Sequence, residues 1–342
     1  MSQGTVGFFS YHLSHCTVAE DFDVDVLVVG AGPGGGNAAL QCARKGLRTV
    51  LIEDHGEIGT PVHCGECISD EAVANLRLNL PPEVISKRVK GIRVIFPDGT
   101  SKQLTETGYV LEKHLFEQWI AQSAVNEGAK LSLKNRLSSM ERIEKDGKFL
   151  GWKCDGKGDI FPLTARIVID ASGVSAVCSK FVKLGNNKPL NEKGKVVAGM
   201  QYELADVPTD GYLDFYIWPK YAEKGYVWMI PKCDGRANVG LVTEDRPRAK
   251  KALDEFIADT HFNDLTRQLP QWKQKGSPTF GGTIPISGPF ENTHHDGLML
   301  IGDAAGFTSP LFEGGSHLAL KSAVFAAETA KIAIDKNDMS KE

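Results

Sequence analysis

A glycine-rich turn between two apolar segments constrains the fold of this chain more than any other feature. Residues 23–54 have the pattern of a strand, a tight turn, a helix and a second strand that ends in an acid. The turn carries Gly30, Gly32 and Gly35 in the spacing G-x-G-x-x-G. The first glycine permits the turn, the second lets backbone approach a pyrophosphate, and the third lets helix and strand pack closely. The segment therefore predicts a dinucleotide-binding βαβ unit.

The rest of this segment supports the same interpretation. The helix would direct free backbone N–H groups and its positive dipole end toward phosphates. Arg44 suits the last turn of this helix, and Gly46 suits its cap. The next strand ends at Glu53, a usual place for a carboxylate that accepts ribose hydroxyls, and we group Asp54 with it as a cofactor contact. These residues predict a dinucleotide but do not separate NAD from FAD.

Charge and composition argue against several other classes of protein. A formal net charge of −4 and the lack of a basic run give no electrostatic case for binding nucleic acid. Residues 1–22 lack the pattern of a signal peptide, and no apolar run reaches the length of a membrane span. Seven scattered cysteines argue against a disulfide framework and for a reducing cytosol. We therefore expect a cytoplasmic protein without a metal site, whose contact with membranes would be peripheral.

A second motif, near the C-terminus, favours FAD. In residues 298–320 a strand ends in Gly-Asp, and a loop with a proline then leads to a helix that begins near two glycines. Placed beside the first glycine turn, Asp303 could hydrogen-bond a ribityl chain, a group that NAD lacks, whereas its alternative role is a simple cap. The helix N-terminus would face the flavin ring. The residues assigned here to the cofactor are Gly302, Asp303, Pro310, Gly314 and Gly315.

A third element and the pattern between the motifs predict the domain organisation. Residues 168–176 have the pattern of a strand that ends in Asp170, followed by a turn of small residues; the alternative is a plain strand and turn. Residues 91–104 alternate around an Asp-Gly turn and predict a hairpin, and 195–245 is rich in strand patterns. We expect an α/β fold with a Rossmann-like FAD-binding domain and an inserted antiparallel substrate domain. The predicted FAD-binding segments are 23–90, 106–185 and 290–342, the substrate segments are 91–105 and 186–289, and 1–22 is an extension. The predicted helices cover 68–85 (in the main), 111–127, 248–270 and 315–334.

Two further strings narrow the interpretation. PVHCGECIS at 61–69 is similar to the Cys-Gly motif of geranylgeranyl reductases, and YVWMIP at 226–231 is similar to their Tyr-x-Trp-x-Phe-Pro signature. With the cofactor motifs, they make the chain resemble this family, and most of all its archaeal-type members, which act on membrane lipids. The resemblance implies a fold like that of p-hydroxybenzoate hydroxylase, non-covalent FAD, and reduction of isolated double bonds in isoprenoid chains. The electron donor, ferredoxin or NADPH, stays open.

The resemblance also implies the site residues. Those near the reaction are Cys64, Gly65, Tyr226 and Trp228, and those against the substrate are Tyr226, Trp228 and Pro231. An isolated alkene has no polar handle and needs an apolar pocket with aromatic walls, so we add Tyr216 and Trp218 as substrate contacts. A thiol at Cys64 could donate a proton, and its neighbours His63 and Glu66 could tune it. For any single aromatic residue, ordinary sheet packing is an equal alternative. Lys113 stands where the family usually has an arginine that contacts the cofactor, and Cys67 creates a C-x-x-C whose disulfide state stays open.

Two alternatives remain. Flavin halogenases and monooxygenases share the cofactor motifs, and the halogenase string Trp-x-Trp-x-Ile-Pro differs from YVWMIP chiefly at Tyr226. Halogenases also rely on a lysine beyond the ribose-binding acid, whereas no lysine lies between Asp54 and Lys87 here. A protein that only holds FAD is the weakest alternative, because it would have no use for the aromatic string. The sequence therefore favours an isoprenoid reductase and leaves its oligomeric state open.

Overall fold

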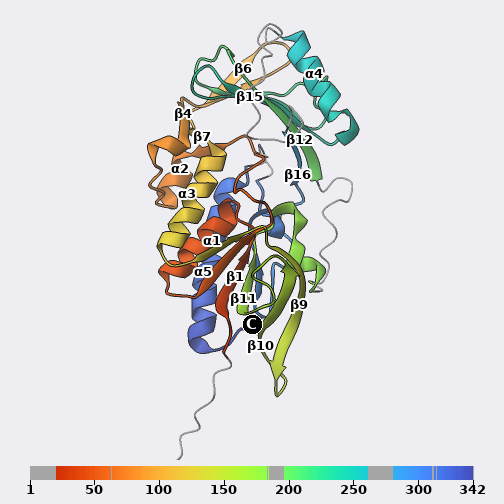
Figure 1. Cartoon of the computed structure of the whole chain (residues 1–342). Coiled ribbons are helices and arrows are strands. Elements are labelled where there is room, and N and C mark those ends of the chain that lie inside the picture. The colour runs from red at the N-terminus through yellow and green to blue at the C-terminus, as the bar shows by residue number, and fades with distance from the viewer. Residues whose placement is uncertain are drawn as a thin grey trace, which may run out of the picture.

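A computed structural model describes residues 21–62, 64–182, 184, 196–260, 280–309, 312 and 314–341. Its core is a sheet of parallel strands with helices on one side, and a second large sheet lies beyond one end (Figure 1). The helices are α1 (Pro33–Arg44), α2 (Asp70–Asn75), α3 (Lys113–Asn126), α4 (Ala249–Asp259) and α5 (Ser316–Lys336). Short 3-10 helices are η1 (Pro82–Val84), η2 (Gly173–Ser175), η3 (Val177–Lys180), η4 (Arg246–Arg248) and η6 (Gly302–Ala305).

The first sheet has the order β17-β18-β11-β1-β2-β8, and the pairs from β18 to β8 are parallel. An antiparallel hairpin of β9 and β10 extends from β11. The strands are β1 (Val24–Val29), β2 (Thr49–Glu53), β8 (Lys130–Leu133), β9 (Arg136–Lys145), β10 (Lys148–Lys157), β11 (Leu163–Asp170), β17 (His294–His295) and β18 (Leu298–Leu300). Since the ends of parallel strands meet at one edge of the sheet, the loops after β1, β2, β11 and β18 lie together.

The second sheet has the order β16-β12-β15-β14-β13-β5-β6 and is antiparallel except between β13 and β5. Its strands are β5 (Ile92–Ile95), β6 (Ser101–Leu104), β12 (Val196–Leu204), β13 (Leu213–Tyr216), β14 (Tyr226–Pro231), β15 (Ala237–Thr243) and β16 (Phe280–Pro285). A smaller sheet of β3 (Cys67–Ser69), β7 (Gly108–Leu111) and β4 (Ile85–Val89) lies between the two. The strands of the second sheet come from the two segments assigned to the substrate domain, and the domain division itself remains our proposal.

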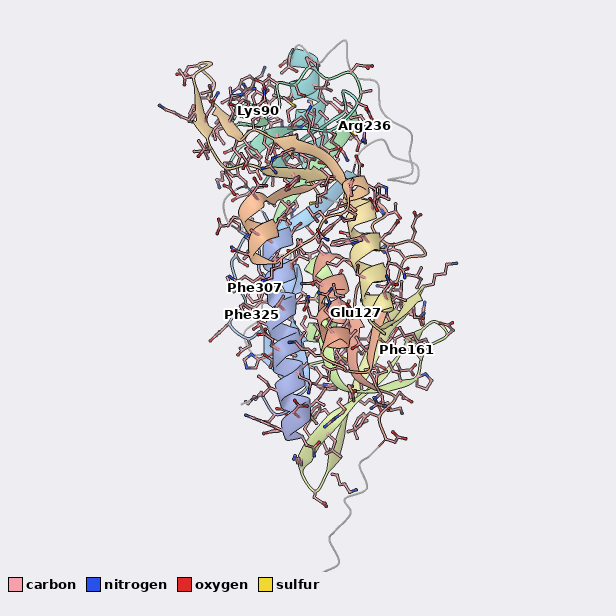
Figure 2. The ribbon with its side chains drawn as sticks, turned by 90° about the vertical axis from the view of Figure 1, so that its left-hand side faces the viewer. Lys90, Glu127, Phe161, Arg236, Phe307 and Phe325 are labelled. Atoms are coloured by element: carbon pink, nitrogen blue, oxygen red, sulfur yellow. The ribbon has the colours of Figure 1, made fainter. Side chains whose placement is uncertain are left out.

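Glycines set how closely α1 packs. A Cβ on Gly35 would stand 1.7 Å from the carbonyl oxygen of Gly30, so only glycine lets α1 lie this close to the end of β1. A Cβ on Gly36 would meet the side chain of Ile120 on α3 at 2.6 Å. Helix α1 therefore fits between α3 and α5, as Figure 2 shows from the helical side.

The structure confirms most of the elements expected from the sequence. The βαβ unit, the 91–104 hairpin and the helices at 111–127 and 315–334 are present within a few residues. The mainly helical segment predicted at 68–85, with a break at Pro81-Pro82, is confirmed only in part. Ser69 caps a short α2 that ends at Asn75, and the 3-10 helix η1 begins at Pro82, since prolines lack the N–H that a continuing helix needs. Ile85 begins the strand that pairs with β7. The predicted helix at 248–270 is confirmed as far as Asp259, and residues 261–279 lie outside the described part.

The second sheet has a different environment on each face. One face packs against α4 in a core that contains Met229 and Phe256, and the other carries Phe215 and Trp228 toward the first sheet. Because strand side chains alternate, neighbouring residues of β14 belong to different faces. Among the described residues no helix has both the length and the apolar character to cross a bilayer.

Candidate active site

A large cavity lies between the edge of the first sheet and the inner face of the second. Its volume is about 1550 Å³, above the roughly 300–1,000 Å³ of ordinary ligand pockets, so it has room for a dinucleotide and a second molecule. Most of the predicted site residues line it. They are Gly30, Gly32, Glu53, Asp54, Cys64, Gly65, Lys113, Tyr226, Trp228, Gly302, Asp303, Gly314 and Gly315. Pro310 and His63 lie outside the described residues.

The glycine turn has the shape that a pyrophosphate needs. Gly30 adopts a φ of 98°, and a Cβ there would stand 2.7 Å from the carbonyl oxygen of Ala171. A Cβ on Gly32 would have no atom within 4 Å, so this glycine faces open space at the N-terminus of α1. Gly35 does not line the cavity; it serves the packing of α1 instead. Gly30 and Gly35 thus have the turn and packing roles expected of them, and the approach of a pyrophosphate to Gly32 stays a prediction.

Glu53 is fixed at the end of β2. Its Oε2 accepts the backbone N–H of Ala31 at 2.8 Å, and its Oε1 accepts the backbone N–H of His55 at 3.0 Å. Burial raises the pKa of Glu53, but these hydrogen bonds outweigh it and lower the pKa below its usual value. Oε1 also contacts Nδ1 of His55 at 2.7 Å, so the lone pair left for a hydroxyl donor is on Oε2. Burial and the charge of Glu53 raise the pKa of the more exposed Asp54.

Asp303 enters the cavity from the 3-10 helix η6. Its Oδ1 accepts the hydroxyl of Thr308 at 3.1 Å, and a Cβ on Gly315 would come within 3.1 Å of the same oxygen. Burial raises the pKa of Asp303 and outweighs the opposing effects of Thr308 and the charge of Lys113. The first turn of α5 lines the same space through Ser316. A half-buried carboxyl beside a helix N-terminus fits the ribityl and ring portions of a flavin.

Asp170, in the third motif, has a structural role. Its carboxylate accepts the backbone N–H of Ser172 at 3.0 Å and that of Cys178 at 2.8 Å. It is fully buried and caps the turn after β11. The plain strand-and-turn alternative therefore holds for Asp170.

Lys113 begins α3 and is buried. Its Nζ contacts Oε1 of Glu117 at 2.7 Å, one helical turn further on. Burial lowers the pKa of Lys113, but the neighbouring Cys64 and Glu117 groups outweigh it and raise that pKa. Lys113 lines the cavity, so its assignment as a cofactor contact remains a proposal that this position supports.

The Cys64 loop lines the cavity between the cofactor motifs of the first sheet and the apolar side chains of the second. The Sγ of Cys64 accepts the backbone N–H of Glu66 at 3.2 Å, and the residue is half-buried. Cys67 is also a free thiol; burial first, and then nearby charges, raise its pKa. The carboxylate of Glu66 contacts Lys232 and Asn238, and its backbone N–H meets the thiol; a role of Glu66 in tuning Cys64 stays a prediction.

Apolar side chains from β13 and β14 form the wall across from the cofactor motifs. Tyr226, Trp228 and Ile230 alternate along β14 and line the cavity together with Phe215. The rings of Phe215 and Tyr226 meet edge to face at 5.3 Å, and Phe312 stacks on Phe215 at 4.3 Å. This wall offers contact area but few polar groups, which suits a hydrocarbon.

Three residues predicted to contact substrate do not line the cavity. Tyr216 and Trp218 lie on the opposite side of the sheet, where their rings pack against Phe256 of α4 at 5.3 and 5.9 Å. Pro231 is the last residue of β14 and pairs with Ala237 in the sheet. The assignment of these three is corrected, because strand alternation places Tyr216 on the face away from Phe215.

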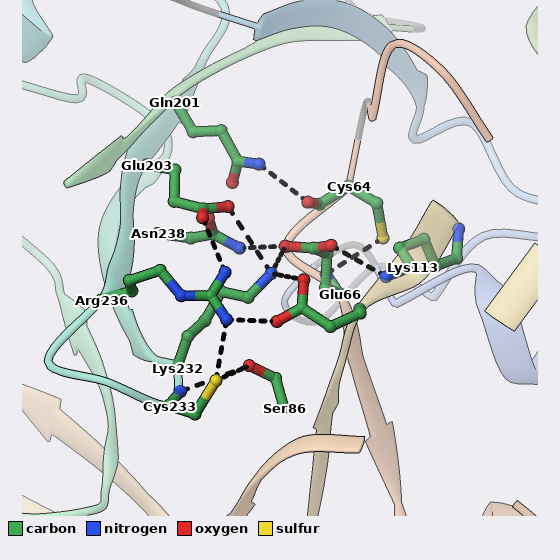
Figure 3. Close-up of polar contacts among 12 residues, drawn as sticks. Cys64, Glu66, Ser86, Lys113, Gln201, Glu203, Lys232, Cys233, Arg236 and Asn238 are labelled. Carbon is green, nitrogen blue, oxygen red and sulfur yellow. Dashed lines mark hydrogen bonds and ion pairs between the residues drawn. The ribbon is translucent and has the colours of Figure 1, made fainter. Parts of the chain in front are cut away.

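A buried group of charged side chains behind the Cys64 loop was missed (Figure 3). It joins residues that are far apart in the sequence, so no local pattern marks it. One signal was present: a lysine directly after a fully buried strand requires a partner, since an unpaired charge is costly to bury. The members of this ion cluster are Glu66, Glu112, Glu203, Lys232 and Arg236.

Comparisons with known sequences match nearly the whole chain. A family model described as FAD dependent oxidoreductase matches residues 25–225, and one described as geranylgeranyl reductase catalytic domain matches 196–270. The chain is 35% identical over 325 residues to the digeranylgeranylglycerophospholipid reductase of Methanocaldococcus jannaschii, covering 93% of this chain and 79% of that protein. It is 34% identical over 330 residues to the enzyme of the same name from Methanothrix thermoacetophila, covering 93% and 80%.

Solved structures agree on the fold. A geranylgeranyl bacteriochlorophyll reductase-like protein from Thermoplasma acidophilum superposes with a TM-score of 0.81 at 32% identity, covering 93% of this chain and 80% of that one. A flavin-dependent brominase variant has a TM-score of 0.71 at 21% identity, covering 93% and 82%. The brominase shows a shared fold alone. The α/β flavoprotein fold that the sequence predicted is confirmed.

Proposed function

The chain belongs to the geranylgeranyl reductase family of FAD-dependent oxidoreductases, and from that premise we propose that it saturates isolated double bonds of geranylgeranyl chains in membrane lipids or their precursors. One observation carries the proposal: a cofactor-shaped cradle, a half-buried thiol and an apolar wall line a single cavity. The relatives named digeranylgeranylglycerophospholipid reductase support the choice of substrate class.

The proposed roles of the cavity residues follow from the chemistry of an isolated alkene. It has no polar handle, so Phe215, Tyr226 and Trp228 would hold it by contact area and exclude water. When bound, reduced FAD would supply the hydride. The thiol of Cys64 would donate the proton that completes saturation, since it lines the cavity near the junction of cradle and wall. Gly65 would leave space for the isoprenoid chain beside Cys64, because a Cβ at this position would stand only 2.9 Å from the side chain of Ile230.

The cofactor would be held by residues that the structure has already brought together. Backbone at Gly30 and Gly32 would face the pyrophosphate, Glu53 and Asp54 the ribose, and Asp303 the ribityl chain. Gly314 and Gly315 would leave space at the N-terminus of α5 for the ring. We further propose that the protein is cytoplasmic, meets its lipid at a membrane surface, and receives electrons from ferredoxin or NADPH.

Halogenation or oxygenation is the second candidate, favoured by YVWMIP and by the brominase fold. Two observations argue against it. Residues 55–86 contain no lysine, and the loop there carries Cys64 instead. Identity to the reductases is also 32–35%, against 14–21% for the brominases and halogenases compared.

An anaerobic flavin assay tests the proposal. Protein reduced with dithionite should reoxidise when a geranylgeranyl glycerolipid is added, and Cys64→Ala should keep FAD while losing at least about 100-fold in rate, as expected for loss of a proton donor. Air turnover with halide and an aromatic acceptor is the control for the second candidate. Halogenated product with no anaerobic reoxidation would overturn the reductase proposal. Unchanged turnover in Cys64→Ala would remove the thiol from the mechanism.

A further inference from the structure

The loop that carries Cys64 is attached to the second sheet at two points close to the thiol. One attachment reaches the Cys64 carbonyl and the other reaches the side chain of Glu66, two residues on (Figure 3). The partners come from β12, from β15 and from the residue that follows β14. The strands that build the apolar wall therefore also support the loop opposite it.

Gln201 makes the first attachment. Its Nε2 donates to the carbonyl oxygen of Cys64 at 2.8 Å, and its Oε1 accepts the indole N–H of Trp228 at 3.2 Å. An indole nitrogen can only donate, so Trp228 determines which end of the amide faces the loop. Gln201 is 3% exposed and does not line the cavity. It can therefore influence the reaction only through Cys64 and Trp228.

Glu66 makes the second attachment. Its Oε2 accepts from Lys232 at 2.8 Å and from Asn238 at 2.6 Å, and its Oε1 accepts the backbone N–H of Lys113 at 3.0 Å. Glu66 also adopts a φ of 71°, a backbone conformation that is strained for a residue other than glycine. Surrounding contacts must hold such a conformation, and here the carboxylate supplies them.

The partners of Glu66 are themselves held in place. Lys232 is fully buried and also contacts Glu112 at 3.0 Å and Glu203 at 3.5 Å. Arg236 joins the same two carboxylates at 2.6 and 2.9 Å. Removing one member of a buried ion group leaves another charge unpaired, so the cluster resists movement. It fixes the end of β14 to Glu66 and to Glu112, which directly precedes α3.

We propose that Gln201 and Glu66 are positioning residues that hold the Cys64 backbone at two points, at Cys64 itself and two residues on, so that the second sheet sets where the thiol stands relative to the apolar wall. This inference rests on the proposed role of Cys64. Trp228 then has a second role besides contact with substrate, because its indole N–H orients the Gln201 amide that holds the loop. Thiol and wall then share one support and keep their separation.

Alkylation of Cys64 in the FAD-loaded protein tests the positioning directly. Gln201→Met keeps the length of the side chain and removes both hydrogen bonds. We expect iodoacetamide to label Cys64 about tenfold faster, as measured by mass spectrometry of the peptide that contains it. The loss of a hydrogen bond should raise the population of open loop by about that factor. We expect kcat to fall about tenfold with KM within twofold. Glu66→Gln, which weakens the second attachment, should change both in the same direction.

A matched variant separates positioning at Cys64 from general loosening. Gln118 also donates its Nε2 to a loop carbonyl, that of Ile58 at 3.1 Å, at the other end of the same segment. Gln118→Met should leave Cys64 labelling and kcat within twofold of the parent protein. An equal effect of Gln118→Met, or unchanged labelling in both Gln201→Met and Glu66→Gln at normal flavin content, overturns the proposal. If Gln201→Met fails to hold flavin, Glu66→Gln decides alone.

The two claims can fail separately. Suppose that Gln201→Met is labelled faster but the parent protein reduces no alkene. The positioning role then stands and the proposed function is refuted. Alkene reduction by the parent, with labelling of Cys64 unchanged in the variants, does the reverse.

Discussion

Changing two glycines of the same turn to alanine should impair two different properties: Gly35→Ala the stability of the protein, and Gly32→Ala its affinity for FAD. In Gly35→Ala the new Cβ would stand 1.7 Å from the carbonyl oxygen of Gly30, inside the 3.0 Å limit of real contacts, so helix and strand must part by 1.3 Å. In Gly32→Ala the Cβ meets nothing within 4 Å, and the φ of −66° suits any residue. The first change is therefore a packing defect, and the second is a defect only when a ligand approaches.

The expected sizes follow from those contacts. Overpacking costs roughly 1–3 kcal/mol, and a clash of backbone with Cβ belongs at the upper end, so we expect Gly35→Ala to lose about 3 kcal/mol of unfolding free energy. For a protein of this size that is about 4 °C in Tm. Gly32→Ala should keep or slightly raise the Tm of the apoprotein, because alanine restricts the unfolded chain. Its affinity for FAD should fall at least about tenfold, about 1.4 kcal/mol.

Thermal unfolding of the apoproteins, followed by titration with FAD, separates the two effects. The reasoning requires opposite profiles: a low Tm for Gly35→Ala, and a normal Tm with weak binding for Gly32→Ala. Gly46→Ala is not a suitable control, since Gly46 has a φ of 75° and is strained for any side chain. Normal FAD affinity in Gly32→Ala would show that the pyrophosphate does not approach this turn, and a normal Tm in Gly35→Ala would refute the packing argument.

Other consequences can be measured on single variants. Asp303→Ala should lower the flavin content of purified protein, read from its visible absorbance, and full occupancy would refute the role of this carboxyl. Lys232→Met should cost about 3–5 kcal/mol in denaturant unfolding, because it strands buried carboxylates. Lys220→Met, which breaks an exposed pair with Asp259, should cost far less because water already solvates both charges, and equal losses would contradict the burial argument. Burial raises the pKa of Glu112, but Lys232 and Arg236 hold it at about 2. Since that pKa is depressed in the folded protein, its contribution to stability should be present above the ordinary value near 4.5 and be lost as pH falls toward 2; Glu112→Gln should flatten this part of the pH–Tm curve.

Features set by neighbouring residues could be predicted from the sequence. The glycine spacing, the apolar run before it and the acid after the second strand are local, and they predicted β1, α1 and β2 to within a few residues. Asp303 could be placed beside Gly30 because parallel strands end at a common edge. The residues of YVWMIP could be assigned to one strand, but which of them face the cavity depends on strand alternation and on α4 behind the sheet.

The errors arise where distant segments decide. The predicted helix at 68–85 ends instead at Asn75, and Ile85 begins a strand that pairs with β7. Tyr216 is aromatic and next to Phe215, so the sequence favours it as a substrate contact, whereas successive side chains of a strand point to opposite faces. Lys232 and Glu66 lie 166 positions apart, so their contact could not be predicted from any local pattern.

The central claim is that reduced flavin in this cavity delivers its electrons to an unconjugated alkene. Its most direct test is the anaerobic stoichiometry between flavin reoxidation and lipid product, followed by absorbance and mass spectrometry of the same samples. The account predicts one saturated double bond, a gain of two hydrogens, for each flavin reoxidised. Flavin that stays reduced in the presence of a geranylgeranyl lipid, or that reoxidises without this gain in mass, would contradict it.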